Sequence, residues 1–224
     1  MRHVVMSSKT LRFYFDYLSP YSYLAWQEIP LVARRHALQL KPTPVLLAAL
    51  LDHHGHKGPG EIAPKRAYVF KDCVRRAATL GVPFEPPFSH PFNPLPALRV
   101  TMLDMGEERR LKLITRLFAA TWAEARDVSS PEVVGAICNE VGVPNALERV
   151  QDPVIKQRLR DVTTEAIELG VFGVPTMLIG DELFWGTDSL RYFESHLAGD
   201  DPVSTIDPAA WDAVRASAMR KRSR

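Results

Sequence analysis

The sequence predicts an α/β fold in which a small mixed sheet, covered by helices, is interrupted by a long helical insertion. Short apolar runs typical of strands occur near both ends of the chain, at residues 11–15, 37–41 and 175–185. From residue 45 to about residue 161, apolar side chains instead recur with helical spacing. We therefore expect a discontinuous sheet domain, residues 10–44 and 162–224, around an inserted helical domain, residues 45–161.

The first strand is expected at residues 11–15, where Leu, Phe and Tyr form an aromatic, apolar run that ends at Asp16. A helix start follows at Ser19-Pro20, because serine is a favoured N-cap and proline is favoured at the first helical position. The apolar residues that continue this helix are Tyr23, Leu24, Trp26 and Ile29. The N-terminal part of the sequence thus predicts a strand that leads directly into a helix.

A second short strand is expected at residues 37–41, closed by Pro42 and Pro44. Within the helical block, the proline-rich residues 83–96 can be neither regular helix nor central strand, so we expect an ordered crossing loop there. A further helix ends at Gly170, residues 175–179 and 182–185 read as a hairpin, and residues 190–197 return to helix. Apart from the insertion, this element order is the thioredoxin arrangement.

Length, charge and cysteine content narrow the class of protein. A chain of 224 residues can bury enough apolar surface to fold without a disulfide or metal, and its two cysteines, Cys73 and Cys138, lie far apart in predicted helices. We expect a reduced compartment, the cytoplasm, and neither a signal peptide nor a membrane span. A net charge of +2 is too weak to predict nucleic-acid binding.

Three of the seven histidines, His53, His54 and His56, crowd into a glycine-rich loop. Clustered histidines can bind a metal ion, but the surrounding Gly55, Gly58, Pro59 and Gly60 indicate a mobile loop, in which we expect no thiolate or acidic partner to complete a site. We therefore expect no metal site.

Ser19 is the sharpest local candidate for chemistry. Partial positive charge gathers at a helix N-terminus, where it stabilises an anion and lowers the pKa of a thiol. Neither Ser19 nor Ser22 is a cysteine, so the sulfur would come from a visiting thiol. The alternative is that Ser19 is only an N-cap, and local sequence alone favours it.

Two further segments could bind a peptide-like ligand. If Pro175 in Gly173-Val174-Pro175-Thr176 is cis, the backbone of Val174 could pair with an extended peptide; otherwise Pro175 simply begins an edge strand. The turn Gly186-Thr187-Asp188-Ser189 could hold a carboxylate through its amides and an ammonium through Asp188, or it could be a plain capping turn. Lys65 could attract a second carboxylate or remain solvated.

Residues 13–25 resemble the opening of 2-hydroxychromene-2-carboxylate isomerases and kappa-class glutathione transferases, which belong to the DsbA-like branch of the thioredoxin superfamily. The resemblance spans nearly the whole chain in the right order. It continues at Pro64-Lys65-Arg66-Ala67-Tyr68, Asp72, Pro91-Phe92-Asn93, Trp122, Asp127, residues 170–176 and residues 184–188. Because these matches occur in order at separated sites, they favour a ligand-binding role for Ser19, Val174 and the turn at residues 186–189 over simple helix capping and a plain edge strand.

The resemblance implies a thioredoxin-like fold with a large inserted helical domain, a cis Pro175, a homodimer, and glutathione as cofactor. It assigns Ser19 to the glutathione sulfur and the Val174 backbone to the cysteinyl unit. The turn containing Gly186, Thr187 and Asp188 would hold the γ-glutamyl end, and Lys65 would lie near the glycyl carboxylate. His56 stands where the family often has asparagine, and Gly58 replaces a usual proline.

The activity implied is a glutathione-dependent isomerisation of 2-hydroxychromene-2-carboxylate-like aromatic compounds, in aromatic catabolism. A kappa-like transferase that conjugates glutathione to an electrophile uses the same site, and a non-catalytic DsbA-like peptide binder keeps the same cis-proline edge. The candidates to line the pocket for the aromatic substrate are Tyr21, Phe92, Asn93 and Trp122. Aromatic residues at such places are more often core.

Overall fold

A computed structural model describes residues 9–207, 209 and 213–215 of the chain. Its centre is a mixed sheet in the order β2-β1-β3-β4, formed by β1 (Thr10–Phe15), β2 (Gln39–Pro44), β3 (Thr176–Ile179) and β4 (Glu182–Trp185). β1 pairs in parallel with β2 and antiparallel with β3, and β3 pairs antiparallel with β4. The expected strand at the N-terminus and the expected hairpin are both confirmed.

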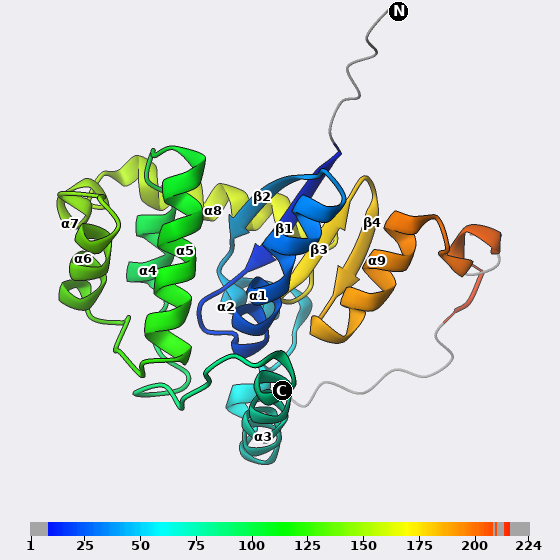
Figure 1. The fold of residues 1–224 in the computed structure, drawn as a ribbon, viewed down its shortest axis with the longest axis horizontal. Helices are drawn as coiled ribbons and strands as arrows, with labels where there is room; N and C mark the ends of the chain where they lie inside the picture. Colours follow the sequence, from blue (N-terminus) through cyan, green and yellow to red (C-terminus); the bar gives the residue numbers. More distant parts are fainter. Residues whose placement is uncertain (1–8, 208, 210–212, 216–224) are drawn as a thin grey trace, which may run out of the picture.

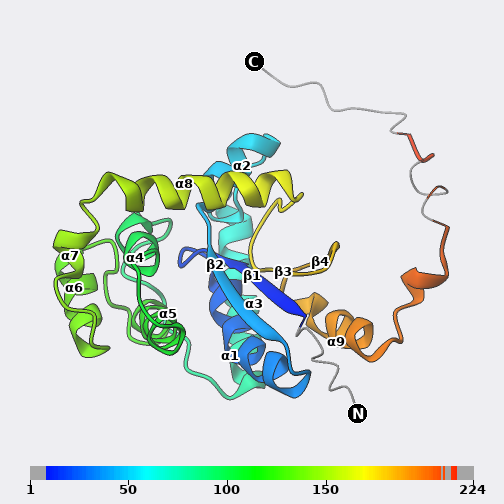
Figure 2. The same ribbon diagram turned by 90° about the horizontal axis from the view of Figure 1, so that it is seen from above.

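Helices cover both faces of this sheet (Figures 1 and 2). Helix α1 (Pro20–Arg35) and helix α9 (Leu190–Ala198) lie on one face, and α2 (Leu47–His54) and α8 (Pro153–Glu168) lie on the other. Leu11, Phe13 and Phe15 of β1 have no exposed surface and join the core on the α1 side, while Tyr14 packs on the opposite side with Val45. The alternation along β1 therefore supplies both cores of the molecule.

β2 differs from the expectation, because it continues through Pro42 and Pro44 instead of ending before them. The sheet order explains this difference. β2 is an edge strand that pairs only with β1, so a proline without an N–H group can point its nitrogen away from the ladder. Proline at an edge does not close a strand.

The residues between β2 and β3 are largely helical. The elements there are α2, a 3₁₀ turn η1 (Pro59–Glu61), α3 (Ala63–Leu80), α4 (Leu95–Thr101), α5 (Glu107–Trp122), α6 (Pro131–Glu140), α7 (Ala146–Arg149) and α8. Residues 82–94 form neither helix nor strand, in line with the expected crossing loop. The domain boundary expected after residue 161 falls inside α8, which contacts both β2 and α4 and thus belongs to both parts.

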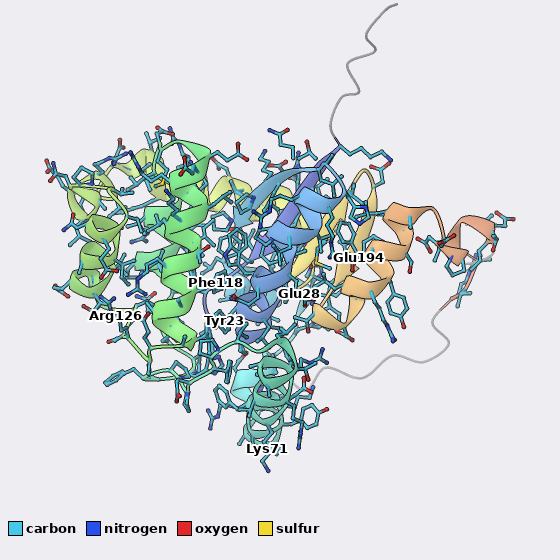
Figure 3. The ribbon with its side chains drawn as sticks, viewed as in Figure 1. Tyr23, Glu28, Lys71, Phe118, Arg126 and Glu194 are labelled. Carbon is cyan, nitrogen blue, oxygen red and sulfur yellow. The ribbon has the colours of Figure 1, made fainter. Side chains whose placement is uncertain are left out.

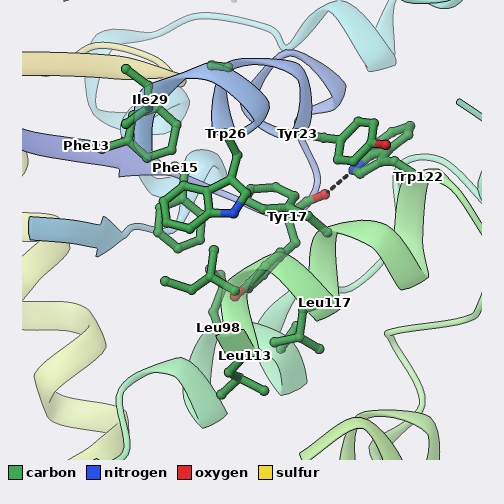
Figure 4. Close-up of a cluster of buried hydrophobic side chains, with 14 of the residues drawn as sticks. Phe13, Phe15, Tyr17, Tyr23, Trp26, Ile29, Leu98, Leu113, Leu117 and Trp122 are labelled. Atoms are coloured by element: carbon green, nitrogen blue, oxygen red, sulfur yellow. Dashed lines mark hydrogen bonds between the residues drawn. The ribbon is translucent and has the colours of Figure 1, made fainter. Parts of the chain in front are cut away.

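The helices α4 to α7 gather beside the sheet, beyond β2 (Figures 1 and 2). An aromatic cluster joins them to it: Phe118 of α5 lies 5.4 Å from Phe15 and 4.8 Å from Tyr17, between ring centroids. The ring centroids of Phe118 and Tyr23 of α1 are 6.3 Å apart; both residues are labelled in Figure 3, and Figure 4 shows the surrounding cluster. The helical segment and the sheet therefore share one core. No helix within the described ranges is long and apolar enough to cross a membrane.

Candidate functional site

Ser19 lies between the end of β1 and the first residue of α1, as the sequence predicts. It is the N-cap of this 16-residue helix, with φ −91° and ψ 113°. Its Oγ accepts a hydrogen bond from the Ser22 N–H at 3.2 Å and donates to the Val174 carbonyl oxygen at 3.4 Å. The structure thus brings Ser19 and Val174, which lie far apart in the sequence, into direct contact.

This corner also holds backbone groups without partners. Val174–Pro175 is a cis peptide bond, which confirms the expectation for Pro175. Neither the Val174 N–H nor the Tyr21 N–H donates to any group among the described residues, and Pro20 has no N–H. The Tyr21 N–H is therefore available at the positive end of the α1 dipole, and the Val174 N–H is available at the cis-proline edge.

A carboxyl group lies buried behind the corner. Asp16 has no exposed surface, and its two oxygens accept hydrogen bonds from the N–H groups of Leu18 and Leu47, both at 2.9 Å. Burial raises the pKa of Asp16 to about 6, although the two backbone hydrogen bonds act in the opposite direction. The sequence analysis missed this residue; its signal was a polar side chain directly after a buried strand.

Residues 17 and 18, which lead to Ser19, are held by the inserted helical segment. The indole Nε1 of Trp122 donates to the Tyr17 carbonyl at 2.9 Å (Figure 4), and His90 Nε2 lies 3.1 Å from the Leu18 carbonyl oxygen. Trp122 has no exposed surface, so of the two alternatives for this residue, lining the substrate pocket or belonging to the core, the structure shows the core position behind the corner.

A second polar centre lies at the turn before α9. Arg76 of α3 donates through Nη1 to Thr187 Oγ1 at 3.1 Å and through Nε to Asp72 Oδ2 at 2.6 Å. Tyr21 donates to the same Asp72 oxygen at 2.9 Å. Burial raises the pKa of Asp72, but the hydrogen bonds from Arg76 and Tyr21 outweigh it and hold this pKa below its ordinary value. Arg76 was not singled out from sequence, although Asp72 and Arg76 have the spacing of a helical ion pair.

The turn itself requires glycine at position 186. Gly186 has φ +87°, and a Cβ atom there would come within 2.7 Å of Asp188 Oδ1. Asp188 is exposed and Thr187 is half-buried, so both can reach a ligand. The turn that is expected to hold the γ-glutamyl end of glutathione is thus linked to Tyr21, two residues beyond Ser19. The link runs from Thr187 through Arg76 and Asp72.

The glycine-rich loop contributes exposed groups. His56 and Lys65 are both exposed, and Lys65 lies in the first turn of α3. The rings of His53, His54 and His56 lie near one another, with centroid distances of 4.9 and 6.2 Å between successive rings. Across the described ranges, no group of three His, Cys, Asp or Glu side chains is arranged to hold a metal ion.

The remaining candidates for the substrate pocket differ in their exposure and contacts. Phe92 is half-buried and packs against the core. Asn93 is exposed, and its Oδ1 accepts a hydrogen bond from the Leu95 N–H at 3.1 Å at the start of α4. Tyr21 is the one of these residues that contacts the polar centre at Thr187, through Asp72 and Arg76.

Comparison with known proteins places this geometry in a family. The model of the DSBA-like thioredoxin domain matches residues 10–198. The chain is 31% identical over 194 residues to the 2-hydroxychromene-2-carboxylate isomerase of Sphingobium xenophagum, covering 85% of this chain and 98% of that protein. It is 24% identical to human glutathione S-transferase kappa 1, covering 90% and 96% of the two chains.

Solved structures agree with these relatives. A 2-hydroxychromene-2-carboxylate isomerase superposes with a TM-score of 0.78 at 28% identity, covering 84% of this chain and 94% of the other. The cytosolic disulfide reductase DsbM of Pseudomonas aeruginosa, determined with GSH, has a TM-score of 0.61 at 16% identity, which is a likeness of fold, and covers 88% and 100%. The expected thioredoxin-like fold is confirmed, and the chain belongs to the DsbA-like family of thioredoxin-domain proteins.

Proposed function

We propose that this chain is a glutathione-dependent isomerase that acts on 2-hydroxychromene-2-carboxylate-like aromatic compounds. The observation that carries the proposal is the hydroxyl of Ser19, which caps α1 and faces the cis-proline edge at Val174. This corner offers hydrogen-bond donors but no sulfur of its own, because residues 19 and 22 are both serine. The reactive sulfur is therefore that of a bound thiol.

The protein's own thiols are poorly suited to the task. Cys73 and Cys138 have no exposed surface, and burial raises the pKa of each to about 12. At neutral pH both remain protonated, and neither is part of the Ser19 corner. Disulfide exchange, which needs a thiolate at the helix start, has no residue to perform it there.

We propose the following placement of glutathione at this corner. Its sulfur lies at the Ser19 hydroxyl, and its cysteinyl backbone pairs with the free N–H and the carbonyl of Val174 beside Pro175. Its γ-glutamyl end lies at Gly186, Thr187 and Asp188. The glycyl carboxylate lies toward Lys65 and His56, which are exposed cationic or polar groups at the start of α3 and in the loop before it.

The chemistry requires no net oxidation or reduction. The glutathione thiolate adds to a conjugated carbon of the substrate, so that a carbon–sulfur bond forms and a double bond becomes single. Rotation about this bond and expulsion of the thiolate then restore the double bond in the other geometry and release glutathione unchanged. The Ser19 hydroxyl stabilises the thiolate; a hydrogen bond to a charged group contributes roughly 1.5–3 kcal/mol, or about one to two pKa units.

A kappa-like transferase is the second candidate, because the same corner would serve and a human kappa transferase is 24% identical. The two reactions differ in their product. An isomerase returns glutathione in full, whereas a transferase consumes one glutathione for each product molecule. Quantifying glutathione and the substrate isomers in one reaction separates them, with aromatic pyruvate-like compounds as isomerase substrates.

Titration of the thiolate absorbance of bound glutathione tests the common step. We expect the thiol pKa of bound glutathione to be lower than that of free glutathione. An unchanged pKa, or no binding in calorimetry, would remove both enzyme functions and leave a non-catalytic peptide binder.

We further propose a homodimer that works in the reducing cytoplasm, to be checked by light scattering and by cell fractionation.

A further inference from the structure

The peptide group between Leu18 and Ser19 is held from both of its sides. Its N–H, from Ser19, donates to the Asp16 carbonyl oxygen at 3.1 Å. Its C=O, from Leu18, is contacted by His90 Nε2 at 3.1 Å. Because a peptide group is planar, these two contacts fix its orientation and thereby the direction in which Ser19 leaves the loop.

The partner atom fixes the tautomer of His90. A carbonyl oxygen can only accept, so the proton of the neutral imidazole must be on Nε2. The other nitrogen, Nδ1, is buried and has no hydrogen-bond partner among the described residues. His90 is therefore a donor through Nε2 alone, and within the part of the chain that the structure describes its one hydrogen bond is to the carbonyl that precedes Ser19.

The ring of His90 is packed between helices α3 and α5 and the backbone of Gly60. It packs against Phe70 of α3 and Trp122 of α5, with ring centroids 5.3 and 5.9 Å apart. On the glycine-rich side, a Cβ atom at Gly60 would lie 2.7 Å from His90 Cε1 and 3.1 Å from Nδ1. Residue 60 must therefore be glycine for the imidazole to keep this place, and the ring joins the glycine-rich loop to the Ser19 corner.

We propose that His90 is a positioning residue for the reaction, which acts as the neutral Nε2–H tautomer to orient the Leu18–Ser19 peptide group and, through it, the Ser19 hydroxyl. His90 touches neither sulfur nor substrate in this role. The Nε2–H tautomer of His90 is expected in the free protein as well. Its role in catalysis rests on the proposed function. The inserted helical segment thus sets the geometry of a hydroxyl that belongs to the sheet domain.

Protonation of His90 opposes this arrangement. A proton on Nδ1 would place a donor against Gly60 with no acceptor. The aromatic neighbours from α3, α5 and the crossing loop carry no charge, and Arg66 of α3 adds positive charge. Burial lowers the pKa of His90 most, the hydrogen bond to the Leu18 carbonyl raises it by less, and the charge of Arg66 lowers it by a smaller amount still. The neutral form is the one that fits.

Three variants test the proposal. His90→Phe keeps a ring and removes the donor; His90→Gln keeps an N–H donor near the position of Nε2; and Phe88→Leu, at an exposed residue of the same loop, is the matched control. We expect kcat to fall roughly tenfold in H90F, with a smaller change in KM for glutathione, because an unsatisfied buried carbonyl lets the peptide group turn. H90Q should recover most of the loss, and F88L should match the wild type.

The thiol pKa of bound glutathione supplies a readout that a merely structural role would not move. We expect it to rise in H90F and to return toward the wild-type value in H90Q. If H90F lowers only the melting temperature and keeps the wild-type kcat and thiol pKa, the positioning role is wrong. If H90F does not fold, the same comparison between H90Q and the wild type decides the question, since loss of kcat in H90Q overturns the role.

Nitrogen NMR of the imidazole of His90 in the ligand-free wild type tests the tautomer without glutathione. We expect the Nε2–H form at neutral pH, and a dominant Nδ1–H form would overturn the inference. This measurement also separates two failures. A protein with the Nε2–H tautomer that binds no glutathione refutes the proposed function and leaves the assignment of the hydrogen bond intact.

Discussion

The two polar regions of the site differ in how they use charge. At the Ser19 corner the polar groups are the Ser19 hydroxyl and the N–H groups of Tyr21 and Val174, all uncharged, and Asp16 is buried behind them. At the turn before α9 the groups are ionic: the Arg76 and Asp72 side chains are 36% and 17% exposed, and Asp188 is exposed. The first region presents buried groups that carry no charge, whereas the second is partly solvated and charged.

This difference indicates a division of labour. Fixed neutral dipoles in a buried corner stabilise a charge that appears on one atom during the reaction, and they need no reorganisation to do so. Charged groups near solvent attract a zwitterionic ligand end but are screened by salt. We therefore expect changes at the corner to lower kcat and changes at the turn to raise KM for glutathione.

The largest effect is expected for Ser19→Ala. Removing the hydroxyl deprives the thiolate of its donor, and the loss of roughly 1.5–3 kcal/mol corresponds to a fall in kcat of about 10- to 100-fold. Steady-state kinetics and the thiol pKa of bound glutathione measure the effect. Ser195→Ala, at a half-buried serine of α9 outside the corner, is the control. Wild-type kcat in S19A would contradict the role of the corner.

The second effect concerns stability and Asp16. Its pKa is raised to about 6 in the folded protein from 3.8, so the folded state binds the proton more tightly. The contribution of this group to the free energy of unfolding must then fall as pH rises from about 4 to about 7, by on the order of 3 kcal/mol. Denaturation at several pH values should show a flatter profile for D16N than for the wild type and for the exposed control D52N. Parallel profiles in all three would refute the buried carboxyl.

A smaller effect is expected for Arg76→Gln at the turn. Loss of the guanidinium releases Thr187 and leaves Asp72 without its ion-pair partner, and we expect KM for glutathione to rise about tenfold with kcat nearly unchanged. The matched control is Arg75→Gln, at the exposed neighbouring arginine of the same helix. Added salt should raise KM in the wild type more than in R76Q. A fall in kcat without a change in KM would remove the contrast between the two regions.

No effect is expected from thiol reagents on the folded protein. Cys73 and Cys138 are buried, and burial raises the pKa of both thiols. Treatment with a thiol-alkylating reagent, followed by its removal and mass spectrometry, should leave both cysteines unlabelled and kcat unchanged. Labelling of either cysteine together with loss of kcat would show that a thiol of the protein takes part.

The sequence revealed the parts of the site whose signals are local. The strand, the N-cap at Ser19 and the hairpin after Pro175 each arise within a few residues, and all lie where they were expected. The continuation of β2 through Pro42 was missed because it depends on that strand being at the sheet edge.

Contacts between distant residues left no such signal. His90 meets the carbonyl of Leu18 across 72 positions, and Arg76 meets Thr187 across 111. Trp122 could be matched to the family by its identity, but its burial behind the corner follows from the packing of α5. Functional groups with a local sequence signal could therefore be predicted from the sequence. The side chains that orient these groups come from distant segments and could be identified only in the folded structure.

Serine in place of cysteine at the start of α1 has a consequence for survival under oxidative stress. A cysteine oxidised to its sulfinic or sulfonic acid is lost to most proteins for good. If the reactive sulfur is that of bound glutathione, as proposed, the thiol that a peroxide oxidises belongs to a small molecule that can dissociate and be replaced. The polypeptide itself then loses no thiol at this corner.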